Sequence, residues 1–382
     1  MSKLETIIPK GWQKKQIKDL LDYERPDKYI VESDKYTLTG KTSVLTANKS
    51  FILGYTDEDF GIYDNIPAII FDDFTTDSKY VDFPFKIKSS AIKILKNRKD
   101  VDLRFIFEKM KSTNFPTGSH KRFYISQYQD MEVLTPPLPE QKKIAEILST
   151  ADEEIKKTDE IIAATEKLKN GLMQKLFTRG IGHTKFKKTE IGEIPEDWKL
   201  LKLKDVAKFT NGKAHERHIV KSGKYIVVNS KFIASNSEVQ KLSDKQLSPL
   251  FKDDVVMVMS DVPNGKALAK CFLIDEDEKY TLNQRICAIH SKEMSGIFLY
   301  YILNRNKYFL NLNDGVGQTN MRKDQVINCP IPVPKVKEQQ SIVDILLSVS
   351  QKVEINKKLK EKLISLKRGL MQDLLTGKVR TN

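Results

Sequence analysis

The chain has 382 residues, of which 40% are hydrophobic, and a formal net charge of +14. This length suffices for two domains with buried cores, and the absence of any run of about 20 apolar residues excludes a membrane-spanning helix, so we expect no membrane partner. The first residues lack the apolar core of a signal peptide, and three cysteines are too few for a disulfide framework or a four-ligand zinc site. We therefore expect a reducing, cytoplasmic environment.

The first segment, residues 8–136, is predicted to form a mixed domain of strands and one helix. Helical spacing of apolar residues predicts a helix at 103–110. Pro84 should confine the last strand to a sheet edge, because proline cannot donate to a sheet. Short apolar or β-branched runs between turn-forming residues predict strands at 29–31, 43–46, 67–71 and 80–87.

A second segment, residues 194–334, repeats this plan. Ile8-Pro9-Lys10-Gly11-Trp12 is echoed 186 positions later by Ile194-Pro195-Glu196-Asp197-Trp198, and these are the only two tryptophans. The stretch at 179–194, which contains three glycines, is predicted to be a connector. Strands are expected at 225–228, 255–259 and 285–289, with a helix at 297–308.

A long helix is predicted to follow each domain, over residues 140–178 and again over 338–376. Glu140-Gln141 returns as Glu338-Gln339, always 198 positions later and without a gap. Each copy carries a narrow apolar stripe for about four heptads, interrupted in the second copy by Lys360, and each should be roughly 50–55 Å long. So narrow a stripe needs a partner helix, and we expect the two copies to pair. A surface helix on its own domain is the alternative. The stripes comprise Leu148, Ile155, Ile162, Leu168, Leu172 and Leu176, and then Leu346, Val353, Leu363, Leu366, Leu370 and Leu374.

The positive charge lies almost entirely outside the two helices, which together carry only about +1. A basic excess on globular domains favours a polyanionic partner, most simply nucleic acid.

No catalytic or metal site is predicted. The sequence has no phosphate-binding loop, no dinucleotide-binding glycine motif, no His-Glu-x-x-His and no Gly-x-Ser-x-Gly. His215 and His218 lack further ligands at a suitable spacing for a metal. The acidic pairs at 72–73 and 253–254 are better explained as turn residues at strand ends than as nuclease carboxylates.

Polar and basic residues in the predicted turns are the candidate DNA contacts. Arg, Lys, Asn and Gln match the hydrogen-bonding groups of base edges, and the basic side chains also bind phosphates. The candidates in the first domain are Tyr23, Arg25, Lys28, Asn48, Lys49, Ser50, Thr75, Thr76, Ser119, His120, Lys121 and Arg122. The candidates in the second domain are Asn211, Lys213, His215, Arg217, Asn229, Lys231, Asn264, Lys266, Gln284, Arg285, Gln318, Asn320 and Arg322.

The whole chain resembles the specificity subunit of a Type I restriction-modification system. The resemblance rests on the Ile-Pro-x-x-Trp openings, on the entry Pro136-Pro137-Leu138-Pro139-Glu140-Gln141 and on the Gly-Leu-Met-Gln that closes each helix. The second entry, Pro334-Lys335-Val336-Lys337-Glu338-Gln339, keeps only the first proline and the Glu-Gln. The resemblance implies an α+β fold with two mixed target recognition domains, at 1–137 and 180–335 with its connector. Spacer helices at 138–179 and 336–382 would form an antiparallel coiled coil, and the two domains would be related by a pseudo-twofold axis.

The same resemblance implies how such a chain works. Each domain would read one half of a bipartite site in double-stranded DNA, and the helices would set the spacer and dock two modification subunits. Those partners would hold S-adenosylmethionine and methylate adenine, while restriction subunits would use ATP and magnesium. The chain itself would need no cofactor and perform no catalysis.

Three alternatives stay open from the sequence. The chain could be the recognition subunit of a Type IIB-like enzyme, or a DNA methyltransferase or nuclease with an undetected site of its own. Binding of S-adenosylmethionine by the isolated chain would distinguish that enzyme. A coiled-coil adaptor that binds only proteins is the third, and it predicts no salt-sensitive affinity for DNA.

Overall fold

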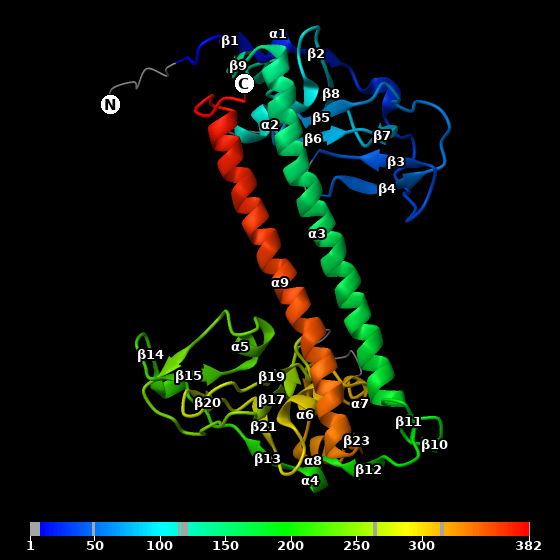
Figure 1. Ribbon diagram of the computed structural model, residues 1–382, viewed down its shortest axis with the longest axis vertical. Helices are drawn as coiled ribbons and strands as arrows, with labels where there is room; N and C mark the ends of the chain where they lie inside the picture. Colours follow the sequence, from blue (N-terminus) through cyan, green and yellow to red (C-terminus); the bar gives the residue numbers. More distant parts are fainter. Residues whose placement is uncertain are drawn as a thin grey trace. The chain divides into compact units, whose positions relative to one another are not determined.

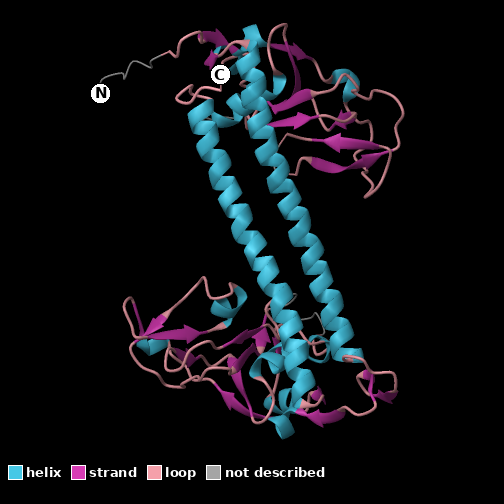
Figure 2. Ribbon diagram, viewed as in Figure 1, coloured by secondary structure: helices cyan, strands magenta, loops and turns pink. Residues whose placement is uncertain are grey.

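The computed structural model describes residues 8–47, 50–113, 115, 121–262, 266–313 and 317–381. The chain divides into two compact units, the first made of residues 1–161 and 356–382 and the second of residues 162–355. Each unit combines one strand-rich domain with one part of each of two long helices (Figures 1 and 2). The predicted α+β fold is confirmed.

The first domain contains two sheets and a separate strand pair. Its elements are β1 (Gln13–Gln16), α1 (Ile17–Leu20), β2 (Leu21–Glu24), η1 (Asp27–Tyr29), β3 (Thr42–Leu45), β4 (Ile52–Thr56), β5 (Ala68–Asp72), β6 (Ser78–Val81), β7 (Phe85–Ile87), β8 (Ile92–Asn97), α2 (Leu103–Ser112), η2 (Tyr128–Asp130) and β9 (Glu132–Thr135). One sheet has the antiparallel order β2-β8-β5-β6, and the other has the order β4-β3-β7 with β3 and β7 parallel. The β1–β9 pair joins the two ends of the domain.

The second domain has the same plan. A hairpin of β10 (Phe186–Thr189) and β11 (Gly192–Pro195) precedes it, within the predicted connector. Its elements are β12 (Lys199–Lys202), α4 (Leu203–Val206), β13 (Ala207–Asn211), η3 (Glu216–His218), β14 (Ile219–Val220), β15 (Tyr225–Val228), α5 (Ser230–Ala234), β16 (Leu242–Ser243), β17 (Val255–Val258), β18 (Ser260–Asp261), β19 (Cys271–Leu273), β20 (Tyr280–Leu282), β21 (Ile286–Ser291), α6 (Gly296–Leu303), α7 (Lys307–Leu310), β22 (Thr319–Asn320), α8 (Lys323–Ile327) and β23 (Pro330–Val333).

The strand order shows that the duplication extends to the topology. The sheet β13-β21-β17-β19 repeats β2-β8-β5-β6, and the β12–β23 pair repeats β1–β9. In the other sheet, the parallel pair β15–β20 repeats β3–β7. The two tryptophan-marked repeats of the sequence therefore fold alike.

The central strand of each domain is buried on both faces. In β5, Ile69 and Phe71 belong to one core cluster and Ala68 and Ile70 to another, as expected when successive side chains point to opposite faces. Strand β17 divides its four apolar residues in the same way. Burial on both faces is the reason why both strands are continuous apolar runs rather than alternating ones.

The two long helices are α3 (Leu138–Arg179) and α9 (Val336–Leu374), close to the predicted bounds. Within the first unit they run antiparallel, because Asp152 bonds Lys367 (2.7 Å) while Asp159, one heptad later, bonds Lys360 (2.6 Å). Figure 1 shows the pair in green and red.

The two long helices also contribute side chains to the cores of both domains. Leu148 and Leu374 lie in the core of the first domain. The core of the second contains Leu176 and Leu346.

The predicted apolar stripe is wrong at one equivalent position of each helix. Leu168 and Leu366 are 55% and 56% exposed. Their neighbours Lys169 and Lys367 lie in the seam instead: the Lys169 ammonium lies 5.8 Å from the Tyr301 ring centre, and Lys367 bonds Asp152. A lysine can bury its aliphatic stem while its ammonium reaches a polar partner. The lysine therefore occupies the inward-facing position, and the leucine that precedes it is left exposed.

Three shorter predictions differ from the structure. Residues 29–31 form no strand, because η1 ends at Tyr29 and only a single bridge joins Ile30 to β7. The predicted strand at 80–87 is two strands, β6 and β7, separated at Pro84, which has no N–H to donate. The predicted helix at 297–308 breaks after α6, and the Asn306 side chain caps a new helix, α7.

Candidate nucleic-acid interface

Each domain has one sheet edge at which strand ends and a returning segment meet. In the first domain, β2 and β5 end and β8 begins there, because β8 is antiparallel to both neighbours. The segment that follows α2 returns to this edge. The Phe123 N–H donates to the Asp73 carbonyl (2.9 Å), and the Tyr124 N–H donates to the Asp73 carboxylate (2.8 Å). We call this the first strand-end edge.

The second strand-end edge is built in the same way. Strands β13 and β17 end there and β21 begins. The Met321 N–H donates to the Met259 carbonyl (2.8 Å), and the Met259 N–H donates to the Arg285 carbonyl (3.2 Å). Met321 follows Phe123 by 198 positions and Met259 follows Asp73 by 186, the two offsets of the sequence repeat. The two edges are therefore equivalent features of the two repeats.

The second edge brings together candidates that are distant in the sequence. The Lys213 N–H donates to the Leu282 carbonyl (3.0 Å), which places Lys213 beside the turn that carries Gln284, and the Gln284 amide donates to Glu216 (3.4 Å). The exposed candidates at this edge are Asn211 at the end of β13 and Lys213 after it, Gln284 and Arg285 before β21, and Gln318, Asn320 and Arg322 in the returning segment. Together they present amide and cationic groups of the kind that bind base edges and phosphates.

A hydrogen-bonded relay joins two of these candidates through a serine that the sequence analysis did not include. The Gln318 amide donates to Ser260 Oγ (2.7 Å), and the Ser260 hydroxyl donates to Asn320 Oδ1 (2.5 Å). Ser260 faces Asn320 across the β18–β22 pair. The signal available in the sequence was the position of Ser260 directly after the buried strand.

The first edge presents a smaller polar group. Thr75 is exposed in the turn after β5, and the Asp72 carboxylate accepts its N–H (2.9 Å). Thr76 has a positive φ of 59°, a conformation that a tight turn imposes. The exposed Arg122 lies with its guanidinium carbon 6.0 Å from the Phe74 ring centre and donates to Ser90 (3.4 Å). The candidates Arg25, Lys28, Ser50 and Lys121 are also exposed.

Tyr23 supports this edge from within. Its ring is half-buried, 5.7 Å from the Tyr124 ring, and the Lys93 ammonium lies 5.3 Å from its centre. Lys93 in turn pairs with the buried Asp73 (3.3 Å). Tyr23 therefore helps to hold the returning segment rather than standing free for a ligand.

Several other candidates are placed apart from these edges. His215 is completely buried, and its ring nitrogens bond the Lys213 carbonyl (2.7 Å) and the Thr281 hydroxyl (2.8 Å), so it positions Lys213 and does not itself face a ligand. Asn229 is the N-cap of α5, where it accepts the Phe232 N–H (2.9 Å). Exposed on other loops or short helices are Arg217, Lys231 and Lys266. The candidates Asn48, Lys49, Ser119, His120 and Asn264 lie outside the described residues.

The acidic pairs serve the turns, as predicted. Asp72 accepts the backbone N–H groups of Phe74 and Thr75 (both 2.9 Å). Asp254 accepts the Phe251 N–H (2.9 Å) and bonds His290 (2.6 Å). The carboxylates of Asp72 and Asp254 are thereby occupied by their own domains.

An indole–carboxylate clasp anchors the start of each long helix, and the sequence analysis missed it. The Arg380 guanidinium donates to both oxygens of Glu140, which also accepts the Trp12 indole N–H (3.1 Å). Burial alone would raise the pKa of Glu140, but the hydrogen bonds from Arg380 and Trp12 outweigh it and hold that pKa below the ordinary value.

The second unit repeats the clasp with a histidine in place of the arginine. Glu338 accepts the Trp198 indole N–H (3.0 Å) and bonds His183 (2.8 Å). The backbone N–H of Ile181 also donates to this carboxylate (2.9 Å). In both units, the chain that leaves one long helix is thus tied to the first turn of the other.

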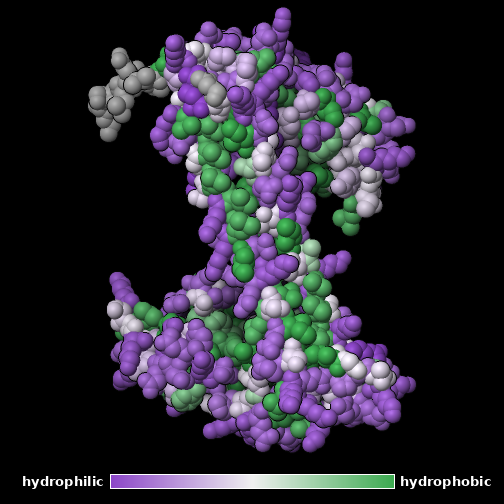
Figure 3. Space-filling model, viewed as in Figure 1, coloured by the Kyte–Doolittle hydropathy of each residue, from purple (hydrophilic) through white to green (hydrophobic). Residues whose placement is uncertain are grey.

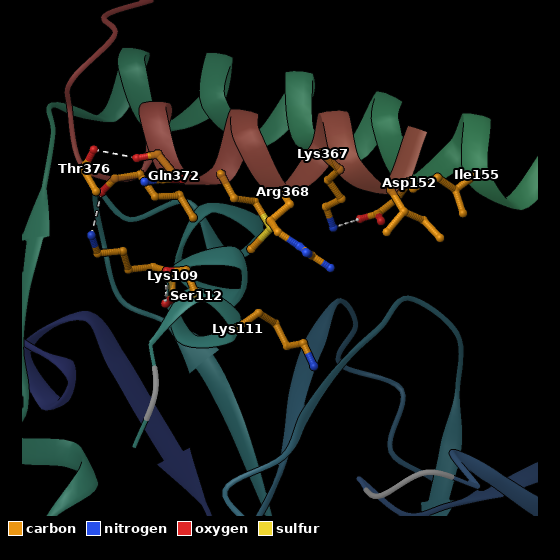
Figure 4. Close-up of a pocket in the computed structure, with 12 residues that line it drawn as sticks. Lys109, Lys111, Ser112, Asp152, Ile155, Lys367, Arg368, Gln372 and Thr376 are labelled. Atoms are coloured by element: carbon orange, nitrogen blue, oxygen red, sulfur yellow. Dashed lines mark hydrogen bonds and ion pairs between the residues drawn. The ribbon is translucent and has the colours of Figure 1, made fainter. Parts of the chain in front are cut away.

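A basic hollow of about 620 Å³ lies in the first unit between α2, α3 and α9. Figure 4 shows the Lys367–Asp152 pair with Arg368 and Lys111 extending beside it. Lys367 also pairs with the buried Glu108 (3.1 Å). Burial lowers the pKa of Lys109 to about 8, and its ammonium donates to the Leu375 carbonyl (2.6 Å). The hollow is lined by four cationic side chains and one carboxylate.

Two features of other classes of protein are absent from the residues with a described placement. No helix there is long and apolar enough to cross a membrane. Within the same ranges, no three His, Cys, Asp or Glu side chains lie together as a metal site would need.

The chain thus has two like domains, each with a polar edge and each packed against parts of both long helices. The comparison with known families identifies the chain further. The family model of the Type I restriction modification DNA specificity domain matches residues 9–166 and 195–364, so the chain belongs to this family. It is the DNA specificity subunit of a Type I restriction-modification system, with a recognition role rather than a catalytic one.

Known proteins are similar over nearly the whole chain. The MjaVIII specificity subunit of Methanocaldococcus jannaschii is 27% identical over 98% of this chain and 94% of that protein. The EcoR124I/EcoR124II specificity subunit of Escherichia coli is 28% identical over 86% of this chain and 84% of its own. The crystal structure of an S subunit from M. genitalium has the same fold, with a TM-score of 0.61 at 17% identity and 98% coverage of both chains.

Proposed function

We propose that each domain reads one half of a bipartite site in double-stranded DNA. The observation that carries the proposal is the equivalence of the two strand-end edges, at the 198 and 186 offsets of the repeat. Residues 1–137 would read one half-site, and residues 180–335, with the connector, the other. The segments 138–179 and 336–382 would set the spacer between them.

Polar side chains of the two edges, exposed or half-buried, are the proposed DNA contacts. Gln284, Arg285, Gln318, Asn320 and Arg322 would meet the second half-site with Asn211 and Lys213. Arg122, Thr75 and Thr76 would meet the first half-site. The net charge of +14 supports this assignment, because phosphate neutralisation supplies much of the affinity of DNA-binding proteins.

The same proposal includes two modification subunits docked on the long helices. Leu168 of α3 and Leu366 of α9 occupy equivalent positions and are both more than half exposed. One heptad earlier, Ile161 and Leu359 are equivalent and are 46% and 44% exposed. Figure 3 shows apolar surface along the visible side of α9. Two identical partners would each find the same apolar pair, and exposed apolar patches of this kind mark interaction surfaces.

The cofactors of the complex are proposed to belong to the partners. S-adenosylmethionine would be held by the modification subunits, and ATP with magnesium by restriction subunits. This chain would contribute recognition and geometry only.

The experiment that tests the proposal is methylation mapping of genomic DNA from cells that carry the chain with its modification subunit. A bipartite methylated motif with a fixed gap, absent when this chain is deleted, is the expected result. Methylation that persists unchanged without the chain would overturn the proposal. Exchange of residues 1–137 with those of a relative should then change one half of the motif only.

A further inference from the structure

The Gln318–Ser260–Asn320 relay has an unusual position for an ordered polar network. Gln318 and Asn320 are exposed, yet both amides are fixed through the one Ser260 hydroxyl by hydrogen bonds of 2.7 and 2.5 Å. Exposed amide side chains ordinarily keep their rotamer freedom, which costs free energy to lose on binding. An amide that is already ordered loses less when a ligand binds.

The backbone around the relay is held as firmly. Strands β18 and β22 pair in the register Ser260↔Asn320, and the Met321 N–H donates to the Met259 carbonyl (2.8 Å). The Asp261 carboxylate accepts the N–H groups of Ala267 (2.7 Å) and Leu268 (3.0 Å), which ties the end of β18 to these two residues. The relay therefore stands on paired, hydrogen-bonded strands.

The hydrogen-bonding capacity that remains defines what the relay can bind. Asn320 uses its oxygen on Ser260, so both N–H groups of its amide stay available. Gln318 uses one N–H on Ser260, so its second N–H and its oxygen stay available. Donor groups thus stand at both ends of the relay, and a free acceptor stands at the Gln318 end. If the serine hydroxyl turns and both amides flip, the free acceptor moves to the Asn320 end.

This pairing fits one base edge better than the others. In the major groove, adenine presents an acceptor, N7, next to a donor, N6-H₂, whereas guanine presents two acceptors. A donor of Asn320 and the oxygen of Gln318 satisfy both groups of adenine, whereas guanine would take two donors and leave the Gln318 oxygen without a partner on the base edge. The relay carries no charge, so it is less suited to phosphates than the exposed Arg322 beside it.

We propose that Gln318, Ser260 and Asn320 form one base-reading unit that recognises an adenine in the half-site of the second domain. The inference rests on the proposed function, because it needs this edge to face DNA. Ser260 acts in it as a positioning residue, since its hydroxyl orders the two amides that touch the base.

The test uses the complex of the full chain with its modification subunit and the DNA site found by methylation mapping. Dissociation constants are measured for the parent site and for every single substitution in the second half-site. The variants are Gln318→Ala, Asn320→Ala and Ser260→Ala. The matched control is Gln240→Ala, which removes an exposed glutamine of the same domain.

Replacement of one particular adenine should weaken binding of the unaltered complex by roughly 5–150-fold. Substitution of 7-deazaadenine at that position removes only the N7 acceptor, so it should weaken binding by a smaller factor. In the three variants, the parent site should bind more weakly and discrimination at that one position should disappear, while the other positions keep theirs. Gln240→Ala should leave every ratio unchanged. Circular dichroism, together with unchanged discrimination at the first half-site, shows that the variants are folded.

Three results would overturn the reading unit. One is a second half-site without adenine, and another is full discrimination at every position in both amide variants. The third is an equal loss on all DNAs, including non-specific DNA, which would make the relay a backbone contact. If the unaltered complex shows no bipartite preference at all, the proposed function fails instead.

Discussion

The indole Nε1 of Trp12 donates a hydrogen bond to Glu140 across 3.1 Å, although 128 residues separate them in the chain. Trp198 and Glu338 form the same contact in the second unit (3.0 Å). The only two tryptophans of the chain therefore mark the points at which each domain holds the first turn of a long helix. In the proposed function, these contacts would hold each domain to a helix that sets the spacer.

Substitution Glu140→Gln should weaken the first unit. It removes the charge that Arg380 binds through both oxygens, and hydrogen bonds to charged groups contribute about 1.5–3 kcal/mol. The urea midpoint at pH 7 should fall accordingly. Trp12→Phe removes the indole hydrogen bond to the same carboxylate and part of a buried side chain, so it should lower the midpoint as well.

The loss in Glu140→Gln should depend on pH. Because the pKa of Glu140 is lowered in the folded chain, its contribution is present above about pH 4.3, the ordinary value, and is lost as the pH falls through the folded value. The difference between the variant and the unaltered chain should therefore shrink below about pH 4.3. A difference that stays constant from pH 7 to pH 3 would contradict the assigned role.

Substitution Lys109→Met should change stability in the opposite pH range. Burial lowers the pKa of Lys109 to about 8, so between that value and the ordinary 10.5 the unfolded chain binds more protons and stability rises with pH. Below about pH 8 the buried charge is a cost. Methionine removes this cost, although it also leaves the Leu375 carbonyl without its 2.6 Å bond.

We expect Lys109→Met to raise the free energy of unfolding at pH 7 by about 1–2 kcal/mol. The variant should also lack the rise between about pH 8 and 10.5 that the unaltered chain shows. Urea titrations at pH 7, 9 and 10 measure both effects. Parallel curves for the two proteins would show that the charge of Lys109 carries no such cost.

Substitution of Leu168 and Leu366 by Asp tests the proposed docking of partners. Both side chains are more than half exposed, so a charge there should leave the fold intact and disfavour burial in an interface. Each single variant should retain one modification subunit, and the double variant none, as measured by the mass of the complex in solution. Asn170→Asp, two residues from Leu168, is the matched control and should keep both subunits. Retention of two subunits by the double variant would place the docking surface elsewhere.

The architecture was predictable from the sequence because its signals are periodic and repeated. The ungapped 198 offset predicts two helices of equal kind, and the apolar runs at 67–71 and 255–259 predict the central strands that are buried on both faces. The seam error at Leu168 has a physical origin. A three-four spacing can be satisfied through Leu168 or Lys169, and only the position of Tyr301 on another element decides for the lysine.

The edges were predictable only in part. Residue types and turns pointed to Gln318 and Asn320, but their link through Ser260 depends on the pairing of β18 with β22, which brings together residues 60 positions apart. His215 shows the opposite error. Its basic loop predicted an exposed imidazole, but the ring is buried and bonds the Thr281 hydroxyl on a neighbouring strand. Long-range pairing of this kind leaves no local pattern.

Insertion of one heptad in both long helices tests their proposed role in setting the spacer. The pairs Asp152–Lys367 and Asp159–Lys360 fix the antiparallel register, which continued by two residues places Ile161 opposite Lys358. A heptad of the same apolar spacing inserted after Ile161 and before Lys358 adds about 10 Å of helix and little rotation. At 3.4 Å per base pair, the preferred spacer should lengthen by at most about three base pairs while both half-sites stay unchanged. Methylation mapping of the variant measures both quantities, and an insertion in α3 alone, which breaks the pairing register, should abolish modification. A change in the half-site bases themselves would mean that the helices, and not the domains, take part in reading the sequence.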